Sequence, residues 1–341
     1  MIRAVLGDTW RQSRQQVVFL VMLVVMLLAL IAGIALPRPI TNASGEKQFG
    51  TILSDRPDTF FASQWVNEYA KTLGAAEGAG AMAALRNSAG DRKLSPTERR
   101  EQMQKFLQAQ QQLRQEASAK AADIPEYRRA VEYYIHFFVG LMFRITMMLF
   151  IAACAGYFPG MLAAGAVDIV LSKPVSRLQI YLSRYVSGVV LYTAAIAVFC
   201  AIFYVGIGLR TGIYHARIFY CIPLLALSAM VLYSLLALIG TASRSATMAM
   251  VMGYVFYAVV DSLISNLLNI QPILEGLGWE SVATAIGVFH HIMPNFSLMN
   301  DMALASLLNM PRFEFTPFAV ALAWLFGSLG LGYWIFKRRD F

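Results

Sequence analysis

The feature that most constrains this chain is a set of long apolar runs, each about the length of a bilayer crossing. The first covers residues 17–36, VVFLVMLVVMLLALIAGIAL, and contains no charged side chain. A transmembrane helix needs about 20 predominantly apolar residues. Similar runs follow at residues 135–158, 185–209, 218–240, 247–268 and 317–336. The sequence therefore predicts an all-α polytopic membrane protein with six transmembrane helices.

Composition excludes the main soluble classes. Only 14% of the 341 residues are charged, against roughly 25% in an ordinary globular chain. The net charge of +8 requires no nucleic-acid partner, because the cytoplasmic ends of spans collect Lys and Arg. The three cysteines, Cys154, Cys200 and Cys221, lie inside apolar runs, where they are expected to be buried thiols rather than disulfide or zinc ligands.

The first run is interpreted as a retained span rather than a cleaved signal peptide. It is longer than an ordinary signal-peptide core, and Leu36-Pro37-Arg38-Pro39 lacks the small residues of a cleavage site. Residues 1–16 before it are expected to form a cytoplasmic interfacial helix with basic side chains facing lipid phosphates.

Basic residues in the short segments set the orientation. With the N-terminus in the cytoplasm, ten basic residues fall inside and three outside, so both termini are predicted to be cytoplasmic and the protein to lie in a bacterial inner membrane. The inside set is Arg3, Arg11, Arg14, Lys173, Arg177, Arg184, Arg244, Lys337, Arg338 and Arg339, and the outside set is Arg210, Arg217 and Arg312.

The polar insert at residues 37–134 would then lie outside the membrane. Ser95-Pro96-Thr97-Glu98 is typical of a helix start, and the Glu-, Gln- and Ala-rich stretch to residue 122 favours helix. A second amphipathic stretch, at residues 61–73, is expected to pack against it as a helical hairpin. Two interpretations stay open: the hairpin covers the tops of the spans, or it is a docking surface for a partner protein or ligand.

The most informative segment is residues 160–177, between the second and third spans. It reads GMLAAGAVDIVLSKPVSR, a short helix at the cytoplasmic surface that ends before Pro174. An ordinary basic loop with a helix-breaking proline is the alternative. If the segment instead carries motion from a partner, the residues expected to make that contact are Gly165, Asp168, Ile169, Leu171, Ser172, Lys173, Pro174, Val175, Ser176 and Arg177, with Arg244 in the next cytoplasmic loop.

Residues 170–177, Val-Leu-Ser-Lys-Pro-Val-Ser-Arg, resemble the Leu-Leu-Ser-x-Pro-Val-Ser-Arg pattern of ABC-2 type transporter permease subunits. The closest resemblance is to the multicopper-enzyme-maturation branch, and Pro294-Asn295-Phe296-Ser297 is a weaker match. The resemblance implies type V exporter-like topology, with a permease core at residues 135–341. It also implies two ABC ATPase subunits that push on the coupling segment, and a second permease subunit, identical or related.

The chain contains no GxxxxGK[ST] phosphate loop and no HExxH or GxSxG motif. It is therefore predicted not to be an enzyme: ATP and Mg would be bound by the partner ATPase, and this chain would hold no cofactor. The alternative is a non-transporting scaffold or sensor whose outer hairpin binds a ligand. A secondary transporter is less favoured, because no internal duplication is visible.

Two ionisable residues lie deep in predicted spans. Arg144 is nine residues, roughly 13 Å, from the outer end of its span, and Asp261 is seven residues, roughly 10 Å, from the outer end of its own. Because such residues normally face a partner or water, the two are hypothesised to pair, either as a structural contact or along a cargo pathway. The histidines His136, His215, His290 and His291 are expected near the outer boundary, with no shared metal.

Overall fold

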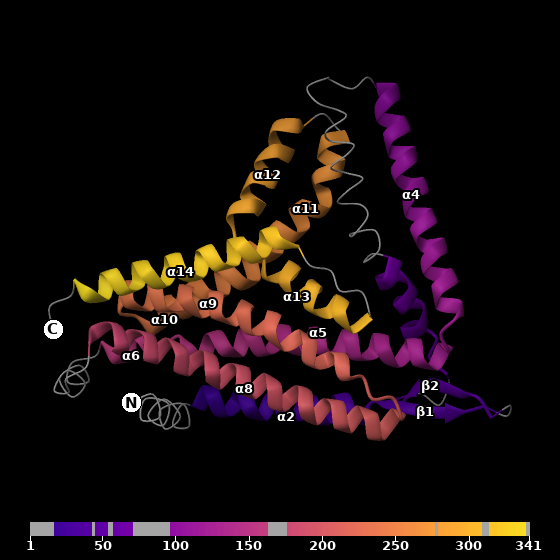
Figure 1. Cartoon of the computed structure of the whole chain (residues 1–341), viewed down its shortest axis with the longest axis horizontal. Coiled ribbons are helices and arrows are strands. Elements are labelled where there is room, and N and C mark those ends of the chain that lie inside the picture. The colour runs from indigo at the N-terminus through magenta and orange to yellow at the C-terminus, as the bar shows by residue number, and fades with distance from the viewer. Residues whose placement is uncertain are drawn as a thin grey trace.

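The computed structural model describes residues 17–42, 45–53, 57–70, 96–162, 176–276, 279–308 and 314–338. Most of the chain is a bundle of long apolar helices (Figure 1). The bundle consists of α2 (Val17–Ala35), α5 (Glu126–Cys154), α8 (Arg177–Thr211), α9 (Cys221–Ser243), α10 (Ala246–Tyr254) and α14 (Phe315–Lys337).

Five helical stretches of the described chain are long and apolar enough to cross a membrane, at Glu126–Met161, Arg177–Thr211, Ala216–Ser243, Ala246–Leu267 and Phe315–Lys337. The 19-residue α2 carries no charged side chain and packs beside α5 and α8. The chain is thus an all-α polytopic membrane protein, as its apolar runs predict.

Local chemistry sets where the helices begin and end. Ser176 and Gln179 form a reciprocal capping box at the start of α8, and Gly212, with φ of 76°, ends it in the left-handed conformation. Arg244 ends α9 with φ of 57°, and the Ser245 side chain caps α10 by accepting from the backbone N–H of Met248. The tight turn between α9 and α10 is therefore specified by two successive residues.

The insert after α2 begins with a hairpin of two antiparallel strands, β1 (Pro37–Thr41) and β2 (Lys47–Thr51), in which Pro39 faces Phe49. Helical composition did not predict these strands. The Phe49 ring is buried, with its centroid 5.2 Å from that of Phe61 and 5.8 Å from that of Tyr134 on α5. An isolated two-stranded hairpin is marginal in water, so this packing is what stabilises it.

The helical part of the insert matches the expected hairpin. A helical segment at residues 60–70 and the end of α4 (Pro96–Ala122) share a buried cluster with α5. Its members include Trp65 and Tyr69, whose rings stack at 4.7 Å, and Ala117 and Ala121 of α4. The rest of α4 projects from the bundle on the same side as α11 and α12 (Figure 1).

After α10 the chain passes through a π-helical segment, η2 (Val255–Val260), into α11 (Asp261–Gly276). It then turns back through α12 (Glu280–Ile292) and enters the short helix α13 (Phe296–Ala305), which continues as the 3-10 segment η3 (Ser306–Leu308). Helix α13 packs on α9, α11 and α5, and its residues Phe296, Met299, Met302 and Ala303 are buried.

Candidate functional site

Two regions at opposite ends of the bundle hold the candidate functional residues. The first is the end at which α6 (Tyr157–Met161), the start of α8 and the end of α14 lie together (Figure 1). The second is the surround of α13 and the β-hairpin, toward the other end. The sequence singled out the first region and the Pro294-Asn295-Phe296-Ser297 string at the start of α13, whereas the β-hairpin was not predicted.

Most of the predicted coupling segment falls outside the described residues. This applies to Gly165, Asp168, Ile169, Leu171, Ser172, Lys173, Pro174 and Val175, and also to the expected interfacial helix at residues 1–16. Its flanks are described: α6 ends at Met161, and Ser176 caps α8. Arg177 donates from Nη1 to the backbone carbonyl of Lys337 at 3.0 Å, which joins the start of α8 to the end of α14.

The flanks of that segment are anchored in a tightly packed aromatic block. Phe158 on α6 has its ring 5.1 Å from Tyr181 on α8 and 5.8 Å from Tyr233 on α9, and all three are buried. Close approach depends on small residues: a Cβ placed on Gly188 would lie 2.5 Å from the Tyr233 ring, and one on Gly240 would lie 3.0 Å from Pro159. A displacement of α6 is therefore expected to move α8 and α9 with it, because close-packed side chains transmit displacement.

Arg244 lies in the turn between α9 and α10. Its backbone N–H donates to the carbonyl of Gly240 at 3.1 Å, and its side chain is exposed. Because α6 packs on α9, the turn and the α6 flank belong to one packed unit. Both of the predicted contact regions therefore connect to α9.

In the second region, the N-terminus of α13 is held by Asp261. The Asp261 side chain is buried and accepts from the backbone N–H of Ser297 at 3.0 and 3.1 Å and from the Ser297 hydroxyl. Asn295 caps the same helix by accepting from the backbone N–H of Leu298 at 2.8 Å. A carboxylate at a helix N-terminus is stabilised by the unpaired N–H groups and the helix dipole.

The predicted partner of Asp261 makes no direct bond to it in the described structure. Arg144 is exposed on α5 and, among the described residues, forms no ion pair with Asp261, although it is near enough for the two charges to interact. The direct Arg144–Asp261 pair stays a prediction, and the structure brings Asp261 and Ser297 together instead. Ser297 belongs to the Pro-Asn-Phe-Ser string noted in the sequence, but its role as donor to Asp261 was missed.

The C-terminal carbonyls of α13 and η3 are held by three donors from other elements. His136 on α5 lies 3.2 Å from the carbonyl of Leu304, and the Cys221 thiol on α9 donates to the carbonyl of Ala303 at 3.1 Å. His215, in the loop between α8 and η1 (Ala216–Tyr220), lies 2.8 Å through Nε2 from the carbonyl of Leu307. These contacts satisfy backbone groups that a helix end otherwise leaves unpaired.

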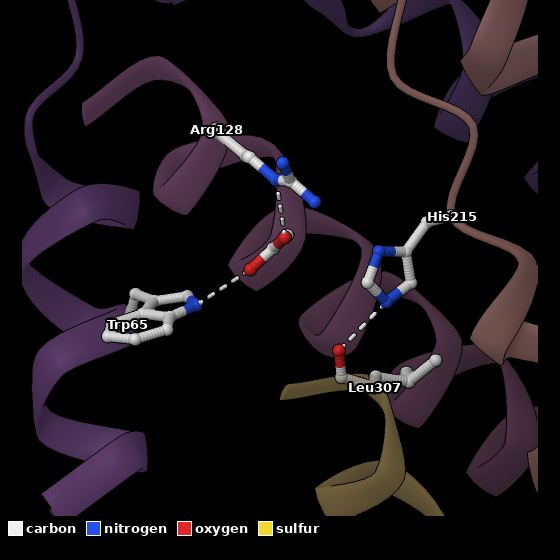
Figure 2. Close-up of polar contacts among 5 residues, drawn as sticks. Trp65, Arg128, His215 and Leu307 are labelled. Carbon is white, nitrogen blue, oxygen red and sulfur yellow. Dashed lines mark hydrogen bonds and ion pairs between the residues drawn. The ribbon is translucent and has the colours of Figure 1, made fainter. Parts of the chain in front are cut away.

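His215 lies beside a second polar contact (Figure 2). Glu132 on α5 is buried and accepts from Trp65 Nε1 at 3.2 Å and from Arg128 Nε at 3.0 Å. Burial lowers the pKa of His215 below its ordinary value, and the Glu132 carboxylate opposes this shift only in part. His215 is therefore neutral at pH 7, with the proton on Nε2 donated to Leu307.

The histidines do not gather into a metal site in the described part of the chain, where no group of three or more His, Cys, Asp or Glu side chains converges. His136 and His215 each bond to a backbone carbonyl, and His291 Nδ1 lies 2.6 Å from the carbonyl of Gly287 in its own helix. The backbone of His290 lies in α12, and its side chain falls outside the described set.

The comparisons with known proteins agree with this architecture. A search of curated proteins found no match. The family model described as "ABC-2 family transporter protein" matches residues 3–341, nearly the entire chain, including the coupling segment and all the apolar helices. The multicopper-maturation branch suggested by the sequence has no further support. With this match across the helical bundle, the chain belongs to the ABC-2 family of transporter membrane proteins and is the permease component of an ABC transporter.

Proposed function

We propose that this permease exports cargo across a bacterial inner membrane, driven by two copies of a separate ABC ATPase. The ATPase chains bind ATP and Mg, and this chain has no catalytic role of its own. A second permease subunit, identical or related, completes the pathway, and both termini lie in the cytoplasm. The ATPases push on residues 160–177, with Arg244 as the second contact.

The observation that carries this proposal is the packing that flanks the coupling segment. One flank, α6, is packed through Phe158 against α8 and α9, and the other begins at Ser176 and is bonded through Arg177 to the end of α14. A push on the segment between them therefore acts on three spans at once. Such a lever has no evident use in a scaffold that does not transport.

The test compares two arginines at opposite ends of α8. Arg177 donates to the carbonyl of Lys337, and Arg210 donates through Nε to the carbonyl of Pro37, each at 3.0 Å. The tagged chain is purified in mild detergent, and co-purified ATPase and its ATP hydrolysis are measured. Replacing residues 174–177, or changing Arg177→Ala or Arg244→Ala, is expected to reduce ATPase recovery or activity at least threefold, whereas Arg210→Ala leaves both unchanged.

The opposite result has a defined meaning. If a folded sample carries no ATPase at all, transport driven by an ATPase partner is wrong, and a scaffold or sensor that uses the outer helices becomes the better description. If the ATPase is present but Arg177→Ala and Arg210→Ala behave alike, the cytoplasmic coupling contact is wrong while the permease assignment stands.

A further inference from the structure

One face of α5 carries a charge that the single chain leaves exposed. Phe137, Leu141, Arg144 and Met148 are all exposed, with the three apolar side chains 50%, 43% and 40% accessible. Their spacing of four, three and four residues places them on one face of the helix. This row is called the Arg144 stripe. The opposite face of α5, with Phe143, Met147 and other buried residues, packs into the core.

Arg144 lies too deep to reach water along the helix. It is nine residues, or about 13 Å, from residue 135, the nearer end of its predicted span. A guanidinium at such a depth is strongly unfavourable against acyl chains, so it faces water, protein or a counter-charge. Among the described contacts it has no ion pair, and the carboxylate of Asp261 is already bonded to Ser297.

A second copy of this chain would not supply the missing charge. The candidate spans of the described chain contain three acidic residues, Glu126, Glu132 and Asp261. Glu132 lies 12 residues from Arg144 toward the outer end of α5, about 18 Å away, and Glu126 lies farther still. Asp261 is buried and bonded within its own protomer. Two copies meeting across this stripe would bring like charges together without an anion between them.

Beside the Arg144 stripe lies α10, which contacts α5. Tyr254 on α10 donates its hydroxyl to the carbonyl of Met148 at 3.1 Å, so α10 adjoins α5 beside the exposed row. Tyr257, one turn further along, is near enough for its hydroxyl to interact electrostatically with both Arg144 and Asp261. The surroundings of Arg144 therefore combine hydroxyl groups, apolar side chains and the nearby carboxylate of Asp261, which is bonded to Ser297 rather than to Arg144.

We propose that Arg144 binds the anionic head group of an amphipathic cargo, while Phe137, Leu141 and Met148 contact its apolar body. The inference rests on the proposed transport function and names its substrate class: a phosphate or carboxylate carried on a hydrocarbon chain. Charge complementarity selects this ligand, because an oxyanion supplies the counter-charge and arginine binds such groups through paired N–H donors.

The test uses dodecyl phosphate, below its micellar concentration, with the complete transporter in phosphatidylcholine nanodiscs. Dodecanol and inorganic phosphate are the controls: the first has the hydrocarbon tail without the charge, and the second has the charge without the tail. Dodecyl phosphate alone is expected to stimulate ATP hydrolysis and raise the melting temperature, since a ligand of the folded state stabilises it. Arg144→Gln raises its half-maximal concentration roughly tenfold or more, as expected for a lost charge-assisted hydrogen bond. Arg144→Lys retains part of the effect, and Arg114→Gln, an exposed arginine on α4, changes nothing.

Equal responses of wild type and Arg144→Gln, or equal responses to dodecanol and dodecyl phosphate, would overturn the proposal. Adding phosphatidylglycerol to the nanodisc identifies the source of the anion: competition with dodecyl phosphate indicates a bilayer lipid, and no competition indicates a free amphiphile. The melting-temperature measurement is repeated on the permease without its ATPase. This measurement tests ligand binding at Arg144 even if the partner ATPase is never recovered. Failure of the ligand proposal can therefore be distinguished from failure of the proposed transport function.

Discussion

Asp261 on α11 and Ser297 on α13 are bonded twice over, through the backbone N–H and the hydroxyl of Ser297. The contact joins residues 36 positions apart and fixes the start of α13 against the C-terminal part of the long apolar stretch Ala246–Leu267. Asp261 follows directly on the π-helical segment η2. Since π-helical turns are rare and occur frequently at functional sites, this junction is a place where sequence change is expected to have large effects.

Removing the carboxylate should therefore destabilise the protein more than removing the hydroxyl. Asp261→Ala leaves two donors unsatisfied in a buried place, at a cost of about 2–3 kcal/mol, whereas Ser297→Ala loses one hydrogen bond, worth about 1 kcal/mol. Thermal unfolding of the purified chain checks the order. Ser262→Ala, an exposed neighbour on α11, should be neutral, and a loss as large as that of Asp261→Ala would contradict the assignment.

The contact between His215 and Leu307 should weaken in acid. Because burial lowers the pKa of His215, the folded state prefers the neutral imidazole. Its stabilising contribution is complete above the ordinary pKa of 6.5 and is lost as the pH falls below that value toward the lowered folded-state pKa. The difference in stability between wild type and His215→Gln, measured by thermal unfolding, should shrink from pH 7.5 to pH 5. The groups facing His215 include Glu132, Arg128 and Arg217, and because the Gln variant retains them, it corrects for their own titration.

Trp65 should hold the helical segment at residues 60–70 in place. Its side chain is only 1% exposed, and its Nε1 donates to Glu132. Trp65→Ala is expected to lower the free energy of unfolding by about 3–5 kcal/mol, because it removes a buried side chain. It also leaves Glu132 without one hydrogen-bond donor. Limited proteolysis should then cut the 60–122 region faster. Phe60→Ala, which removes a side chain that is 57% exposed, is the matched control and should leave the cleavage rate unchanged.

Two glycines in long apolar helices should respond differently to alanine. A Cβ at Gly188 would lie 2.5 Å from the Tyr233 ring, whereas one at Gly330 would meet nothing within 4 Å. Gly188→Ala is therefore expected to lower the melting temperature. Gly330→Ala should raise it slightly, because alanine favours helix by about 0.5–1 kcal/mol over glycine. If both variants behave alike, the aromatic block between α8 and α9 is looser than the contact at Gly188 implies.

Apolar runs predicted the bundle well because span length and hydropathy are local properties. The end points were less predictable. Helix α5 begins at Glu126, nine residues before the apolar run at 135, since Glu132 and Tyr133 near its start contact the insert. The β-hairpin was missed because PRPIT and KQFGT contain proline and glycine, which disfavour strands. It forms through the packing of Phe49 on α5, a contact that no local pattern contains.

The intramembrane acid shows a different limit of sequence reasoning. The sequence hypothesis was based on the matching depths of Arg144 and Asp261, and it considered only charged residues as partners for Asp261. The observed partner of Asp261 is a backbone N–H and a hydroxyl, groups that every helix start or serine offers. The π-helical segment also lies outside a search for a 3.6-residue period, because it adds residues to a turn without changing composition. Ser297 is the partner of Asp261 because of its position in the tertiary structure, not because of its residue type.

The outer helix has a further consequence for how this protein can move. Helix α13 is bonded to α11 at one end and to α5 at the other, across 10 residues, about 15 Å. If the distance between α5 and α11 grows beyond what these hydrogen bonds can span, α13 must either tilt or lose the hydrogen bonds at one of its ends. Losing them would leave buried backbone groups unpaired, which is costly. The part of the permease around α13 is therefore expected to occupy a few discrete positions rather than a continuous range.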